Sequence, residues 1–351
     1  MQKKRIFILA TLCLFTSMSI FLFIPQKSEA APAEKVIEWR LQSLLVPGQW
    51  AFVEGIKALT DYVWQASGGR FKITAYGSGV LIPPGEVLDA VRTGTIEMGH
   101  STGAYWTGKI PIGAMEHHIP FTIRNYLEME CLWKDKKWND IFGQAYAEQN
   151  VKWLGVINTA GNAVMSTKPI RSLNDMKKLK LRTASPGADI LKSVGVPIVM
   201  VPGSEIYSAL STGVIDGATW GAATSERDIK LYEAAKYFLK TYSGDIASEC
   251  VIANMDAWKK LPDDLKAILL LAVQAANDKR MRYYYVSEIT ALNEMVEKHG
   301  VKTTELPEAD VAVLRNASMA FLEKLKAKDP KYSAKAINIL KDFMHELGYM
   351  K

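Results

Sequence analysis

Arg182 is the residue whose type and position point most directly to chemistry. It ends the run LKLR, at the end of a strand predicted over residues 179–183. A planar guanidinium offers paired donors that match the two oxygens of a carboxylate, which a lysine ammonium does not. The alternative is a surface arginine, because three lysines stand close before it in the sequence: Lys177, Lys178 and Lys180. Its place at a strand end favours a site for an anionic ligand.

The sequence shows no recognisable set of catalytic residues. The five histidines, at 100, 117, 118, 299 and 345, lack the spacing of metal ligands, and the pair His117-His118 is more typical of a surface. The chain has no GxGxxG, P-loop, GxSxG or paired-cysteine motif. An enzyme would need a nucleophile and a base from distant segments, and the sequence indicates neither.

A short repeat indicates how the chain is organised around Arg182. Residues 84–99 read PGEVLDAVRTGTIEMG, and residues 202–218 repeat the pattern as PGSEIYSALSTGVIDGA. Each copy predicts a short amphipathic helix, closed by a glycine in the left-handed conformation and followed by an apolar strand. Two such units about one domain apart predict two similarly built α/β lobes, with a ligand between them.

The remaining elements alternate between strand and helix, which favours parallel sheets with crossover helices. Predicted strands include residues 36–44, 71–76, 151–157, 163–167, 198–201 and 248–254. Residues 263–299 carry apolar side chains at helical spacing without a proline. A straight helix of that length would run on the order of 50 Å and would either span both lobes or project from them. A kink near residues 275–277 is the alternative.

The start of the chain reads as an export signal. Lys3, Lys4 and Arg5 precede an apolar run over residues 6–24, and small residues near Ala30 suit a signal peptidase. An uncleaved anchor is the alternative. Loss of residues 1–30 lowers the formal net charge from +6 to about +3, too mild to indicate nucleic acid. Of the three cysteines, Cys131 and Cys250 would remain, as one disulfide or as two buried thiols.

In order along the chain, these features resemble the extracytoplasmic solute-binding subunits of TRAP transporters, the DctP-like family, over roughly residues 34–346. The segments that carry the resemblance are Gly77-Ser78-Gly79, AVRTGTIEMG, Ile119-Pro120-Phe121, residues 169–182, STGVIDGATW and NMDAWKKL. The resemblance implies an α/β, two-lobed periplasmic-binding-protein-like fold with a long lobe-spanning helix. The expected division is 34–157 plus 248–275 for lobe I, 158–247 plus 300–351 for lobe II, and 263–299 for the helix between them.

The resemblance also assigns roles to residues. Arg182 matches the arginine that grips the substrate carboxylate, and Trp220 in ATWG matches a cleft tryptophan of the branch that binds 2-oxo and 2-hydroxy monocarboxylates. In that branch a glutamate and a glutamine ligate a metal ion, where this chain has Thr219 and Asn162. A hard cation prefers carboxylate oxygens, so we expect no metal and no cofactor. Tyr105 and Trp106 match an aromatic wall of the first lobe, and Trp50 is expected to add to it.

The function implied is capture of a small organic carboxylate in the periplasm and its delivery to TRAP membrane subunits. The ligand would be a 2-oxo or 2-hydroxy acid, with aromatic and branched acids equally suited. The alternatives are an exported sensory protein that presents the same ligand to a receptor, and an enzyme acting on a small carboxylate. The sequence leaves both a monomer and a homodimer open.

Overall fold

Two mixed sheets organise the chain. The computed structural model describes residues 35–350 apart from 118, 184–185 and 241–245, so the predicted leader lies outside the described residues. Residues 36–351 form one structural unit. None of the helices in the described part of the chain is long and apolar enough to cross a membrane.

The first lobe is built on the sheet β2-β1-β3-β9-β4. Its strands are β1 (Ile37–Ser43), β2 (Phe71–Tyr76), β3 (Met98–Ser101), β4 (Val151–Ala160) and β9 (Ile246–Asn254). Its helices are α1 (Ala58–Ala66), which a π-helical turn Phe52–Lys57 precedes, α2 (Val87–Arg92), α3 (Tyr126–Glu130), α4 (Trp138–Ala147) and α10 (Met255–Lys260). Apolar residues at helical spacing explain α1, because Ile56, Leu59 and Val63 are all buried in the core.

The second lobe is built on the sheet β10-β8-β5-β7-β6. Its strands are β5 (Val164–Ser166), β6 (Leu181–Arg182), β7 (Gly217–Ala218), β8 (Tyr237–Leu239) and β10 (Lys302–Thr304). Its helices are α5 (Leu173–Met176), α6 (Gly187–Ser193), α7 (Ile206–Ser211), α8 (Ala223–Asp228) and α9 (Leu231–Ala234). The predicted strand 198–201 is reduced to a single bridge between Ile198 and Leu181.

The expectation of parallel sheets was confirmed only in part, because both sheets are mixed. In the first lobe β1 pairs in parallel with β2 and β3, but β9 runs antiparallel to both β3 and β4. In the second lobe β5 is antiparallel to β7 and β8, while β6–β7 and β8–β10 are parallel. The reason is the path of the chain: β4 leaves the first lobe and β9 returns to it, so the two strands pair in opposite directions.

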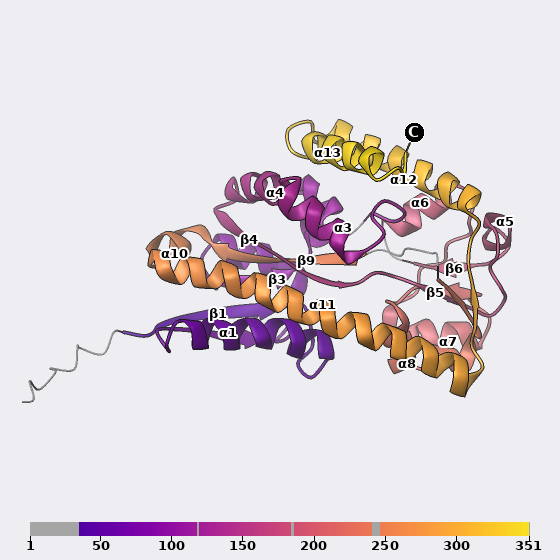
Figure 1. Cartoon of the computed structure of the whole chain (residues 1–351), viewed down its shortest axis with the longest axis horizontal. Coiled ribbons are helices and arrows are strands. Elements are labelled where there is room, and N and C mark those ends of the chain that lie inside the picture. The colour runs from indigo at the N-terminus through magenta and orange to yellow at the C-terminus, as the bar shows by residue number, and fades with distance from the viewer. Residues whose placement is uncertain (1–34, 118, 184–185, 241–245, 351) are drawn as a thin grey trace, which may run out of the picture. The chain divides into compact units, whose positions relative to one another are not determined.

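The long helix was predicted correctly. α11 (Asp263–His299) is one continuous α-helix, unbroken at residues 275–277, and it ends at Gly300, which has φ 69°. Leu265, Leu269 and Val273 near its start pack in the first-lobe core, whereas Ala291 and Met295 near its end pack in the second-lobe core. Figure 1 shows its path from α10 to α7 and α8.

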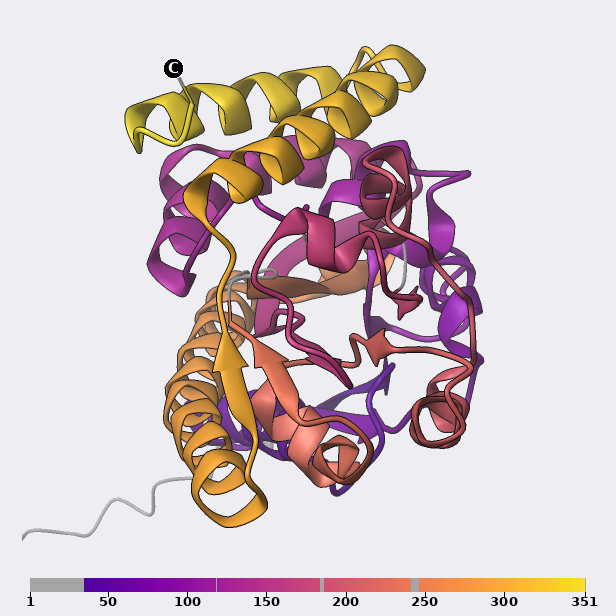
Figure 2. The ribbon, with the colours of Figure 1, turned by 90° about the vertical axis from the view of Figure 1, so that its right-hand side faces the viewer.

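The two C-terminal helices, α12 (Glu308–Lys328) and α13 (Ser333–Glu346), belong to residues that the sequence analysis placed in lobe II. Val311 and Leu314 of α12 do pack with second-lobe residues. Leu322, Leu325 and most of the buried face of α13 pack instead with Trp133, Trp138 and Phe142 of the first lobe. The pair lies along one side of both lobes in Figures 1 and 2.

Each copy of the sequence repeat forms the predicted helix, glycine turn and strand. Gly94 follows α2 with φ 76°, and Gly213 follows α7 with φ 74°. The acidic residue after each turn holds the neighbouring parallel strand. Glu97 Oε2 accepts the backbone N–H of Arg40 at 2.8 Å, and Asp216 Oδ2 accepts that of Lys180 at 2.9 Å.

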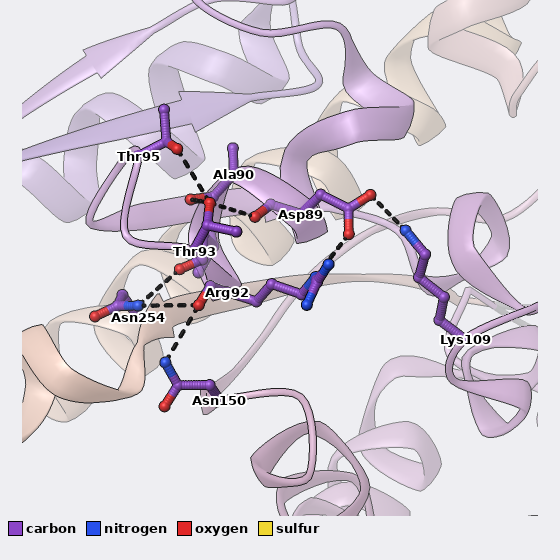
Figure 3. Close-up of polar contacts among 9 residues, drawn as sticks. Asp89, Ala90, Arg92, Thr93, Thr95, Lys109, Asn150 and Asn254 are labelled. Atoms are coloured by element: carbon purple, nitrogen blue, oxygen red, sulfur yellow. Dashed lines mark hydrogen bonds and ion pairs between the residues drawn. The ribbon is translucent and has the colours of Figure 1, made fainter.

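The C-terminus of α2 is also clasped by two asparagines (Figure 3). Asn254 Nδ2 donates to the carbonyl of Val91 at 2.9 Å, and Asn150 Nδ2 donates to that of Arg92 at 3.2 Å. The helix end therefore has acceptors satisfied from β9 and from the residue before β4. The segments AVRTGTIEMG and NMDAWKKL meet here, so part of the family resemblance reflects this packing.

Phe121 joins the two cores. Its φ of 66° is unusual for a bulky residue, and strain of this kind costs roughly 1–3 kcal/mol. Its ring is buried in the second-lobe core, whereas Ile119, two residues earlier, is buried in the first-lobe core. Contacts with α12 hold the segment: Ser318 Oγ donates to the carbonyl of Pro120 at 2.6 Å and Arg315 Nε to that of Phe121 at 3.3 Å.

A buried carboxyl group lies in the first-lobe core. Glu116 Oε1 accepts the N–H of Gly103 at 2.8 Å, and Oε2 accepts the hydroxyl of Tyr146 at 2.6 Å. Tyr146 Oη in turn accepts the indole N–H of Trp106 at 2.9 Å. Burial raises the pKa of Glu116 to about 7, against the opposing effect of these hydrogen bonds.

This pKa predicts a pH-dependent stability. The folded chain keeps Glu116 protonated to about pH 7, whereas the unfolded chain releases the proton near 4.5. The stabilising contribution is therefore complete below 4.5 and is lost as the pH rises through about 7, at most about 3 kcal/mol. Glu116→Gln should gain unfolding free energy relative to the parent between pH 5 and 8, measured by urea titration. A difference that stays constant over that range would contradict the prediction.

Candidate functional site

Four of the predicted site residues meet at one edge of the second sheet. β6 and β7 are parallel, with Arg182 opposite Ala218, so their carboxyl ends lie side by side. β5 runs antiparallel to β7, which places the start of β5 at the same edge. Thr219 and Trp220 follow β7, and Asn162 precedes β5, where the N–H of Ala163 donates to the carbonyl of Gly221 at 2.6 Å. Ligands commonly bind outside the carboxyl ends of parallel strands.

Arg182 is held by the backbone of its neighbours. Its Nη1 donates to the carbonyl of Thr219 at 2.7 Å and its Nε to that of Val201 at 3.2 Å. These bonds use two of the five donors of a guanidinium. The group is half-buried, and burial lowers its pKa. Among the described residues no carboxylate pairs with it, so a positive charge and free donors remain for an anion.

Trp220 lies beside this guanidinium. The guanidinium carbon of Arg182 is 5.8 Å from the centroid of the indole, and 44% of Trp220 is exposed. Thr219 is buried instead, and its hydroxyl donates to that of Thr183 at 3.0 Å. Thr219 therefore contributes its carbonyl to the orientation of Arg182, while its side chain faces Thr183. Asn162 is half-buried.

Sequence reasoning missed two residues of this site. Val201 supplies a carbonyl to Arg182, and Met200 before it is 62% exposed. The segment was predicted as a strand without a role, since a backbone acceptor leaves no signal in residue type. Met200 lies inside the predicted strand 198–201, and its exposure could not be read from the sequence.

In the first lobe, Trp50 and Tyr105 follow the carboxyl ends of β1 and β3. Trp50 stacks on Tyr283 and Tyr284 of α11, with ring centroids 5.5 and 6.1 Å apart. Tyr105 is 54% exposed. Both residues thus follow the carboxyl ends of the parallel strands β1 and β3, as Thr219 and Trp220 follow β7 in the second sheet.

Trp106 lies elsewhere. It is 4% exposed, its indole N–H is used by Tyr146, and it packs in the core with Met115 and Ile112. The sequence pair Tyr105-Trp106 splits because the short helical turn Gly103–Trp106 points successive side chains in different directions. Trp106 is therefore part of the first-lobe core, and this placement gives no support to a direct contact with ligand.

The first lobe brings together a serine, a histidine and a glutamate, which bears on the enzyme alternative. Ser43 Oγ lies 3.0 Å from Nδ1 of His100, and Nε2 of His100 lies 3.2 Å from Oε2 of Glu249. Arg280 of α11 pairs with the same carboxylate oxygen at 2.8 Å. Ser43 is fully buried, so no substrate reaches its hydroxyl. The cluster ties β1, β3 and β9 to α11.

Neither a metal site nor a disulfide is formed by the described residues. Within residues 35–350, less the gaps, no group of three His, Cys, Asp or Glu residues is placed to hold a metal ion. Cys131 and Cys250 are both free thiols. A cavity of about 590 Å³ lies in the first lobe, between the end of α2 and α10. Its polar lining includes Glu97, which is already bonded to Arg40, and Asn254, which is already bonded to the end of α2, so we assign it no ligand.

Known proteins share this architecture. The family model for bacterial extracellular solute-binding proteins, family 7 (DctP), matches residues 49–329. The chain is 28% identical over 300 residues to a monocarboxylate 2-oxoacid-binding periplasmic protein of Nostoc sp., covering 84% of this chain and 80% of that protein.

Solved structures agree in fold. A TRAP periplasmic solute-binding protein from Colwellia psychrerythraea with bound calcium and pyruvate superposes with a TM-score of 0.78 at 23% identity, covering 90% of this chain and 96% of that one. DctP7 of Bordetella pertussis, an extracytoplasmic solute receptor binding pyroglutamic acid, gives 0.73 at 19% identity, with coverages of 87% and 100%.

These proteins bind solutes outside the cytoplasm for transport and are not enzymes. The matched region covers most of the chain and includes the strands of the second lobe, α11, and the first lobe apart from β1. The chain belongs to the family 7 bacterial extracellular solute-binding proteins, the DctP family of TRAP transporters.

Proposed function

We propose that this chain captures a small organic monocarboxylate between its lobes and delivers it to TRAP membrane subunits. The observation that carries the proposal is Arg182. It is a half-buried cation, oriented by two backbone carbonyls, without a carboxylate partner among the described residues. A half-buried guanidinium has lost part of its hydration, so a charge-assisted hydrogen bond to a bound anion stabilises it strongly.

The surroundings of Arg182 favour an acid with an apolar or aromatic body. Trp220 exposes apolar surface beside the guanidinium, and the exposed Met200 precedes Val201, whose carbonyl accepts from Arg182. Asn162 adds an amide near the same edge of the sheet. A 2-oxo or 2-hydroxy acid would place its carboxylate on Arg182 and its second oxygen near Asn162. Trp50 and Tyr105 of the first lobe would cover the ligand when the lobes close. The 2-oxoacid relative of Nostoc and the pyruvate complex of Colwellia support this class of ligand.

Arg182→Ala should abolish most of the affinity for the acid. Removing one partner of a desolvated charge pair costs on the order of 2 to 5 kcal/mol. Arg182→Lys should recover only part of this loss, because one ammonium cannot reproduce two parallel hydrogen bonds. Isothermal calorimetry with pyruvate and larger 2-oxo acids measures both variants, after circular dichroism has established that they fold. If folded Arg182→Ala bound within about threefold of the parent, roughly 0.7 kcal/mol, the site assignment would fall.

We further propose that binding needs no metal ion. The hydroxyl of Thr219 faces Thr183, and Asn162 offers a single amide oxygen, which is a weak set for a hard cation. The second polar group of the ligand would be held by Asn162 or by water, with Thr219 acting through its carbonyl on Arg182. Calorimetry before and after chelation should give the same affinity. A large loss that calcium, magnesium or sodium restores would show that a cation completes the site.

A homodimer is the assembly that we propose. The second half of α11 exposes an apolar set that a second copy would cover: Tyr285, Val286, Ile289 and Val296. A structural neighbour from Bordetella bronchiseptica is described as a dimer. Light scattering at micromolar concentration should give twice the mass of one chain, and Val286→Glu should reduce it to a monomer. A monomeric mass for the parent would contradict the proposal.

A further inference from the structure

The indole of Trp220 lies against the backbone of Gly203. A Cβ atom on residue 203 would lie 2.1 Å from Cζ3 and 2.4 Å from Cη2 of this ring. Both distances are far below van der Waals contact, so the ring occupies the place where any other residue would carry its side chain. Gly203 begins the 3₁₀ turn Gly203–Glu205, which follows directly on the segment that contains Met200 and Val201.

The backbone at residue 203 does not itself demand glycine. Gly203 is absent from the residues with positive φ. The first copy of the repeat shows the same turn: Pro83 (φ −57°, ψ 143°) precedes Pro84–Glu86, as Pro202 (φ −56°, ψ 151°) precedes Gly203–Glu205. The first residue of the turn is Pro84 in one copy and Gly203 in the other. The same backbone position therefore accepts a full ring in the first lobe, and in the second the indole of Trp220 occupies the place of a side chain.

We propose that Gly203 is a specificity-determining positioning residue, which seats Trp220 beside Arg182. The inference rests on the proposed function, because it concerns the ligand that Arg182 holds. The missing side chain lets the indole pack on the turn, and its exposed part then forms a wall for the body of the acid. A methyl group at residue 203 would force the indole away from the turn and into the space that a larger acid needs.

The chain offers a matched control for this idea. Gly85 belongs to the Pro-Gly pair of the first copy, is exposed, and has nothing within 4 Å of the place where a Cβ would stand. Gly85→Ala therefore makes the same chemical change as Gly203→Ala without a clash. Trp220→Phe removes the outer ring of the indole, and with it the atoms that the new methyl group would meet. The double variant Gly203→Ala/Trp220→Phe completes the cycle.

The first measurement uses no ligand. Thermal unfolding should show a lower Tm for Gly203→Ala than for Gly85→Ala. In the Trp220→Phe background, the additional Gly203→Ala change should lower Tm less than it does in the parent. Equal effects of Gly203→Ala in both backgrounds would show that the indole does not need the glycine seat, and would overturn the proposal whatever the protein binds.

The second measurement compares pyruvate with the larger 4-methyl-2-oxopentanoate by calorimetry. Gly203→Ala should weaken the larger acid by about tenfold or more, the scale on which a displaced aromatic anchor matters, and pyruvate less. Gly85→Ala should leave both affinities unchanged. Equal weakening of both acids, or none, would overturn the role in specificity. If the parent bound neither acid while the Tm cycle showed coupling, the proposed function would fail and the seat for Trp220 would stand.

Discussion

A half-buried guanidinium must find acceptors on every side that water cannot reach, and this requirement organises the second lobe around Arg182. Two carbonyls meet it, from Thr219 after β7 and from Val201 after the bridge at Ile198. Because both acceptors are backbone atoms, they orient the group without neutralising its charge. A carboxylate side chain at either place would have formed an internal ion pair and left less for a ligand.

The first lobe shows the opposite solution to the same problem. Arg280 is fully buried there, and Glu249 pairs with it at 2.8 Å, next to His100. That pair neutralises the charge and ties α11 to the sheet. The two arginines therefore differ in their partners. Arg280 has a structural role because Glu249 of the same chain neutralises it, whereas Arg182 keeps its charge for a ligand because its neighbours are carbonyls. The long helix, which packs in both lobes, connects the two settings.

Much of the fold could be predicted because periodicity and glycine chemistry act locally. The repeat, its left-handed glycines and the helix over residues 263–299 follow from spacing and conformational preference alone. Strand direction did not follow, since it depends on where β4 and β9 cross between lobes. The role of Trp106 also depended on tertiary packing, because two adjacent aromatic residues give no sign of which one turns inward.

The same limit applies to the candidate site. Arg182 was proposed from its residue type and its place at a strand end, and Thr219, Trp220 and Asn162 from the family resemblance. The structure places these four residues at one edge of the second sheet. Val201 acts through a carbonyl, which no residue type reveals. Gly203 belongs to the repeat, but the pattern does not show that the ring of Trp220 lies where its side chain would be. The buried set of Ser43, His100 and Glu249 was equally invisible, as its members are about 50 to 200 residues apart in sequence and meet only when β1, β3 and β9 pair.

Mass spectrometry of the small molecules that denaturation releases from gently purified protein tests most directly whether Arg182 holds a carboxylate. We expect the parent to release one small organic acid per chain, and a folded Arg182→Ala variant prepared in parallel to release little or none. A compound without a carboxylate, or the same acid in equal amount from both proteins, would contradict the proposed carboxylate site.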